Sequence, residues 1–144
     1  MTSLSYKTMC KTVWVNGCFD VLHPGHIELL KVGKSLSQGG QLIVGLDSDS
    51  KIRNDKGDSR PINTFSDRKA ILEAIQYVDC VLEFSTRLEL EELIEMYHPD
   101  VLLDGGDWRE HEGVGRRFAK EVRFFNRVGG YSSSEIIERC KRSN

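Results

Sequence analysis

The sequence predicts an α/β fold, a Rossmann-like three-layer α/β/α sandwich with a five-stranded parallel sheet. Three observations support this prediction. Short apolar runs alternate with longer helix-like stretches, capping pairs open several of these stretches, and glycine pairs or polar segments separate them. Such alternation is typical of parallel βαβ units joined by right-handed crossovers. We therefore expect one sheet that is covered by helices on both faces.

Strands and helices are expected in alternation along the chain. The predicted strands span residues 13–15, 41–46, 80–84, 101–103 and 122–125. The predicted helices span residues 25–36, 64 to 74 or 77, 86–97, 114–120 and 132–139. Short apolar runs bounded by turn signals are consistent with buried strands.

Local signals mark several of the expected helix ends. Thr64 with Asp67, and Thr86 with Glu89, have the spacing of a capping box, which marks a helix start. The pair Gly39-Gly40 ends the first helix, because glycine interrupts helical periodicity.

Polar segments follow four of the predicted strands. The first strand leads into a histidine motif, the second into residues 47–61, the fourth into Gly105-Gly106-Asp107 within residues 104–113, and the fifth into a serine run. Residues 47–61 are expected to form a functional loop. The carboxyl ends of parallel strands share one edge of a sheet, and ligands bind beyond that edge at a switch point. We therefore expect these segments to meet at one site.

The composition is that of an ordinary globular chain. Its 144 residues are 39% hydrophobic and 29% charged, and the formal net charge is −2, so general affinity for nucleic acid or an anionic membrane is not expected. We expect an N-terminal extension over residues 1–11 and a single domain over residues 12–144. The four cysteines are scattered, and apolar runs stay shorter than the roughly 18–20 residues of a membrane helix. Reduced thiols in a cytoplasmic protein without a signal peptide are expected.

The histidine motif is the most informative feature for function. His23 and His26 flank Pro24-Gly25 at the start of the first predicted helix. Residues at i and i+3 share a helix face, and a helix N-terminus favours an anion. We expect this anion to be a nucleoside triphosphate. A structural histidine or half of a metal site is the alternative, although a metal needs about three or four ligands.

A serine run at the start of the last predicted helix could form a second anion site. Ser132, Ser133 and Ser134 follow the glycine pair Gly129-Gly130. One hydroxyl is enough to cap a helix, whereas three hydroxyls beside exposed N–H groups could also hold a phosphate. Arg127, just upstream, could add a fork of donors.

Three cations between the second and third strands are candidates for phosphate contacts. Lys56 lies in the polar segment that follows the second strand, and Arg68 lies on the next predicted helix. Lys56 and Arg60, a lysine and an arginine on this loop, could close over phosphates. Solvated surface charges are the alternative for these residues.

Two segments together resemble the signatures of the cytidylyltransferase-like nucleotidyltransferases. Residues 17–26 match the H-x-G-H signature of that family, and residues 132–136 resemble its second signature. In the second signature, Tyr131 replaces the leading apolar residue and Ser134 replaces a threonine. The resemblance begins at about Lys11 and covers nearly the whole chain. It implies an enzyme that transfers a nucleoside monophosphate from an NTP, ATP or CTP, to a small phosphorylated acceptor, and it implies a homodimer.

The resemblance also implies roles for individual residues. Catalytic residues would be His23, His26, Lys56 and Arg68. Nucleotide-binding residues would be Gly17, Cys18, Phe19, Gly25, Asp107, Arg127, Ser132, Ser133 and Ser134. Acceptor-binding residues would be Asp20, Asp47 and Trp108, where Asp20 orients either the loop or the acceptor. Mg²⁺ would accompany the NTP, held largely by phosphate oxygens and water rather than by protein ligands.

Two branches of this family share features with the chain. Residues 16–20, residues 56–61 and Gly105-Gly106-Asp107 are similar to the adenylyltransferase domain that makes ADP-heptose from D-glycero-β-D-manno-heptose 1-phosphate. Residues 68–72 and 106–108 are similar to glycerol-3-phosphate cytidylyltransferase. Residues 57–61 favour the heptose branch, and the nucleobase stays open. A non-catalytic nucleotide-binding module with the same pocket is the alternative from another functional class.

Overall fold

The computed structural model describes residues 10–105, 113–126 and 129–142 of the chain. The strands are β1 (Thr12–Gly17), β2 (Gln41–Asp47), β3 (Cys80–Phe84), β4 (Val101–Asp104) and β5 (Glu121–Phe124). The helices are α2 (Pro24–Leu36), α3 (Asp49–Lys56), α4 (Phe65–Glu73), α5 (Arg87–Tyr97) and α6 (Ser133–Arg142), with a 3₁₀ turn, η1, at Arg116–Phe118.

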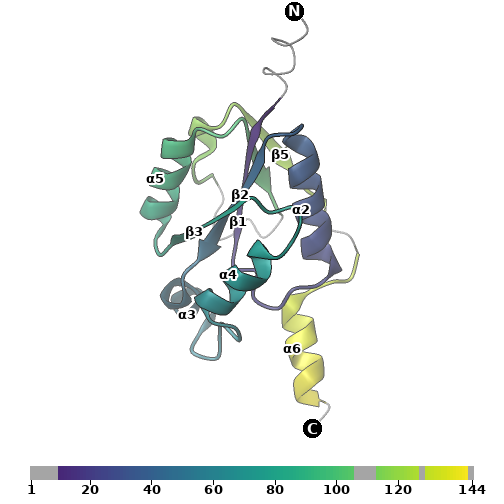
Figure 1. Ribbon diagram of the computed structural model, residues 1–144. Coiled ribbons are helices and arrows are strands. Elements are labelled where there is room, and N and C mark those ends of the chain that lie inside the picture. The colour runs from purple at the N-terminus through teal and green to yellow at the C-terminus, as the bar shows by residue number, and fades with distance from the viewer. Residues whose placement is uncertain (1–9, 106–112, 127–128, 143–144) are drawn as a thin grey trace, which may run out of the picture.

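The five strands form one parallel sheet in the order β3-β2-β1-β4-β5 (Figure 1). This topology confirms the predicted fold class. The chain moves outward from β1 through β2 to β3 and then crosses back to place β4 on the other side of β1. The switch point of the sheet therefore lies between the carboxyl ends of β1 and β4, where α/β sheets bind ligands.

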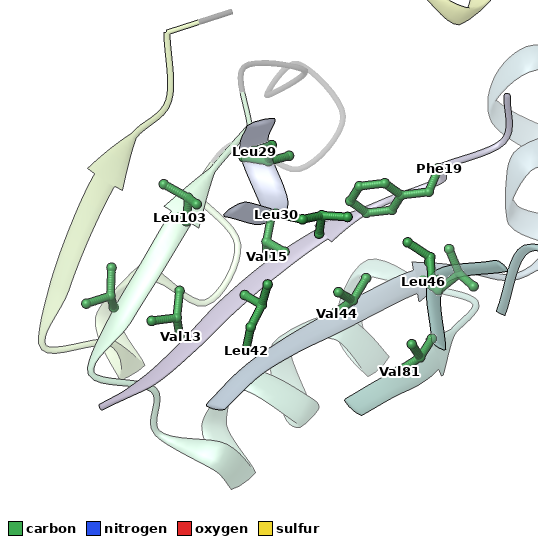
Figure 2. Close-up of a cluster of buried hydrophobic side chains, with 12 residues drawn as sticks. Val13, Val15, Phe19, Leu29, Leu30, Leu42, Val44, Leu46, Val81 and Leu103 are labelled. Atoms are coloured by element: carbon green, nitrogen blue, oxygen red, sulfur yellow. The ribbon is translucent and has the colours of Figure 1, made fainter. Parts of the chain in front are cut away.

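Alternating side chains of the strands build a core on each face of the sheet. Val13 and Val15 of β1 belong to one apolar cluster, together with Leu30 of α2 (Figure 2). Trp14, between them, points to the other face and packs in a cluster with Ile94 of α5. This period of two is the geometry of a strand. The two clusters make the sheet the middle layer of the sandwich.

Two of the expected elements differ in the structure. Residues 47–61 are not simply a loop, because they contain helix α3. The hydroxyl of Ser48 accepts a hydrogen bond from the backbone N–H of Lys51 at 3.2 Å and so caps this helix. The predicted helix over residues 114–120 is only the 3₁₀ turn η1, since Gly115 at φ 75° precedes it and β5 begins soon after it.

Among the described residues, none of the helices combines the length and the apolar character that a membrane crossing requires. Helix α6 extends away from the body of the sandwich, and its first turn lies near the start of α2 (Figure 1). The hydroxyl of Ser133 donates a hydrogen bond to the backbone carbonyl of Val21 at 2.6 Å. This contact joins the N-terminus of α6 to the segment that leads from β1 into α2.

Candidate functional site

A cavity of about 560 Å³ lies at the carboxyl edge of the sheet, between segments that follow β1, β2 and β4 and the N-terminus of α6. The sequence-predicted site residues that line it are Gly17, Cys18, Phe19, His23, Gly25, His26, Asp47, Lys56, Ser132, Ser133 and Ser134. Asp107, Trp108 and Arg127 lie outside the described residues. The two signatures from opposite ends of the chain therefore share one cavity.

The two histidines are held by the start of α2. His23 is the N-cap of this helix, and its backbone N–H donates a hydrogen bond to Nδ1 of His26 at 3.2 Å. The two rings are stacked with their centroids 3.8 Å apart, and the ring of Phe19 lies 5.4 Å from that of His26. Gly25 leaves room for this stack, because a Cβ at this position would lie 2.9 Å from the His23 ring.

The N-terminus of α6 forms another side of the cavity. The hydroxyl of Ser132 caps the helix by accepting a hydrogen bond from the backbone N–H of Glu135 at 3.3 Å. The ring of Tyr131 stacks on that of His23 with centroids 5.7 Å apart and an interplanar angle of 15°. Since α2 also begins at this cavity, two helix N-termini lie beside it, and the positive ends of their dipoles favour a bound anion.

Lys56, at the end of α3, reaches across the cavity toward β1. Its ammonium group donates to the thiol sulfur of Cys18 at 3.4 Å. Burial raises the pKa of the Cys18 thiol, an effect that the nearby charge of Lys56 opposes only in part. The thiol therefore stays protonated near neutral pH, so it serves as a neutral contact for the lysine and not as a nucleophile.

Asp20 does not line the cavity, and its expected contact with the acceptor stays a prediction. Its side chain is fully buried and accepts hydrogen bonds from the backbone N–H groups of Ile62 and Asn63 at 2.8 and 2.9 Å. It also pairs with Nε of Arg60 at 3.1 Å. The carboxylate of Asp20 thus fixes the segment after α3 to the segment after β1, which agrees with a role in orienting the loop.

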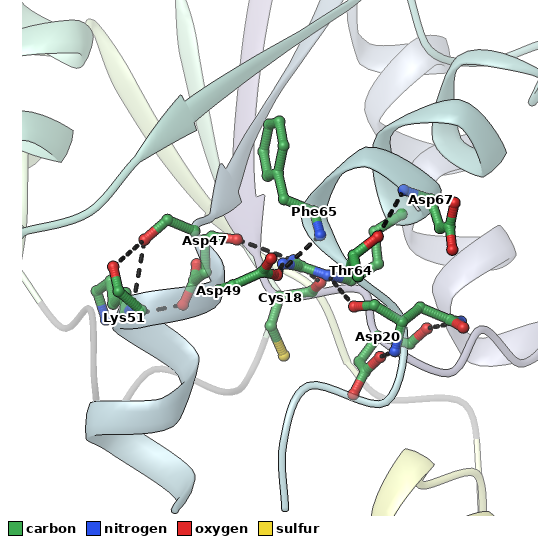
Figure 3. Close-up of polar contacts among 12 residues, drawn as sticks. Cys18, Asp20, Asp47, Asp49, Lys51, Thr64, Phe65 and Asp67 are labelled. Atoms are coloured by element: carbon green, nitrogen blue, oxygen red, sulfur yellow. Dashed lines mark hydrogen bonds and ion pairs between the residues drawn. The ribbon is translucent and has the colours of Figure 1, made fainter. Parts of the chain in front are cut away.

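Arg68 does not line the cavity, and its expected catalytic role stays a prediction. Its side chain is fully buried, and NH1 donates to the backbone carbonyls of Cys18 and Asp47 at 2.9 and 2.8 Å. The other contacts go to the carbonyl of Asn63 at 2.9 Å and to Oδ1 of Asp49 at 2.7 Å. Figure 3 shows the polar network around these segments. The guanidinium therefore holds the backbone that carries Cys18 and Asp47, two residues of the cavity.

Comparison with known proteins agrees with this geometry. The family model described as cytidylyltransferase-like matches residues 14–139. The chain belongs to the cytidylyltransferase-like family. Its relatives include the bifunctional protein HldE of Helicobacter hepaticus, 45% identical over 142 residues, and that of Nitratiruptor sp., 44% identical over 136 residues. The matches cover 99% and 94% of this chain but only 29% of each relative, so the chain spans under a third of their length.

Solved structures support the same fold. The lipopolysaccharide core biosynthesis protein from Thermoplasma volcanium is similar with a TM-score of 0.68 and 26% identity, over 81% of this chain and 97% of that one. A macrolide-efflux protein from Streptococcus pneumoniae, at 19% identity and a TM-score of 0.57, shares the fold over 92% of this chain and 53% of that one.

The cavity of this cytidylyltransferase-like domain also contains residues that sequence reasoning missed. They are Asn16, Asp104, Arg116 and Tyr131, whereas Arg60, a candidate for phosphate contacts from its loop position, also lines the cavity. Arg116 reaches Asp104 with NH2 at 3.3 Å from Oδ2. The position of Asn16 and Asp104 at the ends of predicted strands was an available signal for two of them. The place of Arg116 depends on the 3₁₀ turn, which the sequence pattern did not indicate.

The described residues contain no group of three or more histidine, cysteine, aspartate or glutamate side chains that could hold a metal ion. The polar groups of the cavity are instead imidazoles, hydroxyls, an ammonium and guanidinium groups, with carboxylates at Asp47 and Asp104. Donors of this kind are suited to phosphate oxygens.

Proposed function

We propose that this domain is a nucleotidyltransferase that transfers a nucleoside monophosphate from an NTP to a small phosphorylated sugar or polyol. The preferred reaction is that of a D-glycero-β-D-manno-heptose 1-phosphate adenylyltransferase, with ATP as donor and ADP-heptose as product. The observation that carries this proposal is that His23, His26 and the serine run line one cavity at the start of two helices. This arrangement is suited to one polyphosphate.

The choice of the heptose branch rests on sequence. Residues 56–61 are similar to the segment of ADP-heptose-forming adenylyltransferases. The relatives at 42–45% identity are named HldE, and a structural neighbour at 26% identity is named as a lipopolysaccharide core biosynthesis protein. Glycerol-3-phosphate cytidylyltransferase activity is the alternative, favoured by the similarity of residues 68–72.

The proposed chemistry needs no general base from the protein. A phosphate monoester has a second pKa near ~6 and is mostly a dianion at neutral pH. Its oxygen forms a bond to the α-phosphorus of the NTP, the bond from that phosphorus to the bridging oxygen breaks, and pyrophosphate leaves with the electron pair. The protein has to align the two phosphates and stabilise the charge that develops between them.

The contacts of these groups support a task for each of them in the proposed reaction. Nδ1 of His26 accepts a hydrogen bond from the backbone, so its Nε2 carries the proton in the neutral ring and can donate to a phosphate oxygen. His23, stacked between His26 and Tyr131, would donate beside it. Lys56 would bridge the phosphates of nucleotide and acceptor from the α3 side. The hydroxyl of Ser134 and the N–H groups of α6 would hold the β and γ phosphates.

Further partners complete the proposal. Mg²⁺ would arrive with the NTP and be held by phosphate oxygens and water, where it neutralises charge. A homodimer and a cytoplasmic location are proposed from the family resemblance and from the cysteines, since the described residues contain Cys10, Cys18, Cys80 and Cys140 as free thiols.

The test is a pyrophosphate-release matrix with the purified chain. ATP, CTP, GTP and UTP are each combined with heptose 1-phosphate and with glycerol 3-phosphate. We expect release that requires both substrates and is greatest with ATP and heptose 1-phosphate. Greatest release with CTP and glycerol 3-phosphate would support the alternative substrate pair. Binding of NTP without acceptor-dependent release in any combination would instead support a non-catalytic nucleotide-binding module.

A further inference from the structure

Lys51, on α3, is a buried lysine held between two carboxylates. It is only 6% exposed, and its ammonium nitrogen lies 2.5 Å from Oδ2 of Asp55 and 3.7 Å from Oδ2 of Asp47. The same nitrogen lies 5.9 Å from the centre of the Phe84 ring. Lysine is almost never buried this deeply unless it is paired, because an uncompensated ammonium is costly in an apolar interior. Lys51 and Asp55 lie at i and i+4 on α3, whereas Asp47 is the last residue of β2.

The two carboxylates differ in what they face. Asp55 is partly exposed, whereas Asp47 is 2% exposed and lines the cavity. The backbone carbonyl of Asp47 is held by Arg68 at 2.8 Å, and its side chain pairs with Lys51 (Figure 3). Arg68 thus holds the backbone of Asp47, and Lys51 forms an ion pair with its carboxylate.

The Asp47 carboxylate in the cavity can accept hydrogen bonds from hydroxyl groups of a ligand but repels phosphate groups. An ionised carboxylate is only a hydrogen-bond acceptor, so it attracts O–H donors and repels phosphate oxygens. Asp47 lies at the end of β2, whereas the serine run begins α6. The ammonium group of Lys56 contacts the thiol of Cys18, and both residues line the cavity together with Asp47. Asp47 thus belongs to the part of the cavity where Lys56 would meet the acceptor.

We propose that Lys51 is a positioning residue for acceptor selection. It holds the Asp47 carboxylate in one orientation, in which Asp47 accepts hydrogen bonds from hydroxyl groups of a phosphorylated sugar or polyol. This inference rests on the proposed function and adds a reason for selectivity. An acceptor that lacks the hydroxyl would leave a buried carboxylate without its partner, which sites of this kind penalise strongly.

The experiment compares four forms of the full chain with the wild type: Lys51→Met, Asp47→Asn, the double variant, and Lys34→Met as a matched control. Lys34 forms a comparable pair with Asp79 at 2.7 Å, but neither residue lines the cavity. Pyrophosphate release gives kcat and KM for ATP and for heptose 1-phosphate. Calorimetry gives the acceptor affinity of each form without turnover.

We expect Lys51→Met to raise the acceptor KM and Kd at least ~10-fold, the scale of losing a hydrogen bond to a charged group. The KM for ATP should stay within ~2-fold, because the lysine acts only through Asp47. Asp47→Asn should show the same pattern, and the double variant should be no worse than Asp47→Asn alone. Lys34→Met should match the wild type.

Three results would overturn the inference: an unchanged acceptor KM and Kd in Lys51→Met, an equal rise in KM for ATP, or additive losses in the double variant. If Lys51→Met does not fold, the comparison of the charge-neutral double variant with Asp47→Asn still decides between coupling and independence. An absence of turnover in the wild type would count against the proposed function, whereas the calorimetric comparison still tests the role of Lys51.

Discussion

Nδ1 of His26 lies 3.2 Å from the backbone nitrogen of His23, so the first histidine of the motif fixes the tautomer of the second. The N–H of the helix cap is satisfied by the imidazole, and the proton of the neutral ring is left on Nε2. The spacing of the two histidines therefore caps the start of α2 and also places both rings at the cavity.

The role of His26 predicts a loss of turnover without a loss of fold. His26→Ala should lower kcat by at least ~100-fold, the scale of removing one donor to a developing charge. The measurement is steady-state pyrophosphate release, with circular dichroism to verify folding. His98→Ala is the control, because His98 caps the end of α5 and does not line the cavity. Equal effects of the two substitutions would contradict a catalytic role for His26.

The buried thiol of Cys18 predicts a distinct reactivity. Because burial raises its pKa, the thiolate fraction at neutral pH is small, and alkylation should be slower than at the exposed Cys10 and Cys140. Its rate should continue to rise as the pH passes the ordinary thiol value of about 8.5. An NTP should slow the reaction, since Cys18 lines the cavity. Peptide mass spectrometry checks this, and rapid alkylation at pH 7 that ATP does not affect would be the contrary result.

The buried hydrogen bonds of Arg68 predict that its substitution lowers the stability of the fold. Arg68→Met removes donors from the backbone carbonyls of Cys18 and Asp47, and each unsatisfied buried acceptor costs about 1–3 kcal/mol. We expect a loss of roughly 3 kcal/mol in the free energy of unfolding, measured with urea. A variant as stable as the wild type would show that these contacts contribute little.

The lowered pKa of the Asp100 carboxyl predicts that the stability of the fold depends on pH. Its Oδ2 accepts a hydrogen bond from the backbone N–H of Thr12 at 2.8 Å, and this bond lowers the pKa of the carboxyl, with a smaller effect from Lys120. A lowered folded-state pKa contributes stability above the unfolded-state value of about 3.9, and the contribution disappears as the pH falls through the folded-state value.

Asp100→Asn should therefore be less stable than the wild type by about 0.5–1 kcal/mol at pH 7, with the difference shrinking as the pH falls below ~4. Thermal unfolding at a series of pH values measures this difference. A gap between the two proteins that is the same at pH 3 and pH 7 would argue against the role of the charged carboxylate.

The fold could be predicted because its strands are short apolar runs that stand out in the sequence. Val13, Trp14 and Val15 are apolar without exception, as strands covered on both faces are. Helix α3 escaped prediction because Ile52 is its only fully buried apolar residue, and its polar side chains resemble those of a loop. Its stability comes from the cap at Ser48 and from the charged pairs of Lys51, which the pattern of apolar residues does not reveal.

The candidate site was predictable where a motif places residues at a strand end or a helix start, as for His23 and His26. It was not predictable where the burial of a charge decides the role. Arg68 lies four residues before the buried Leu72 on α4, which places it on the buried face of that helix. That spacing was a signal for a structural arginine. The pairing of Asp20 with Arg60 joins segments that only the folded chain brings together.

The most direct test of the account is the affinity for ATP and AMP in His26→Ala and Ser134→Ala, because these residues come from opposite ends of the chain and line one cavity. Calorimetry should show that each substitution weakens ATP binding at least ~3-fold, the scale of one lost hydrogen bond. Ser134→Ala should leave AMP binding within ~2-fold, because AMP lacks the β and γ phosphates. If Ser134→Ala binds ATP as tightly as the wild type while His26→Ala does not, the two signatures do not hold a common triphosphate.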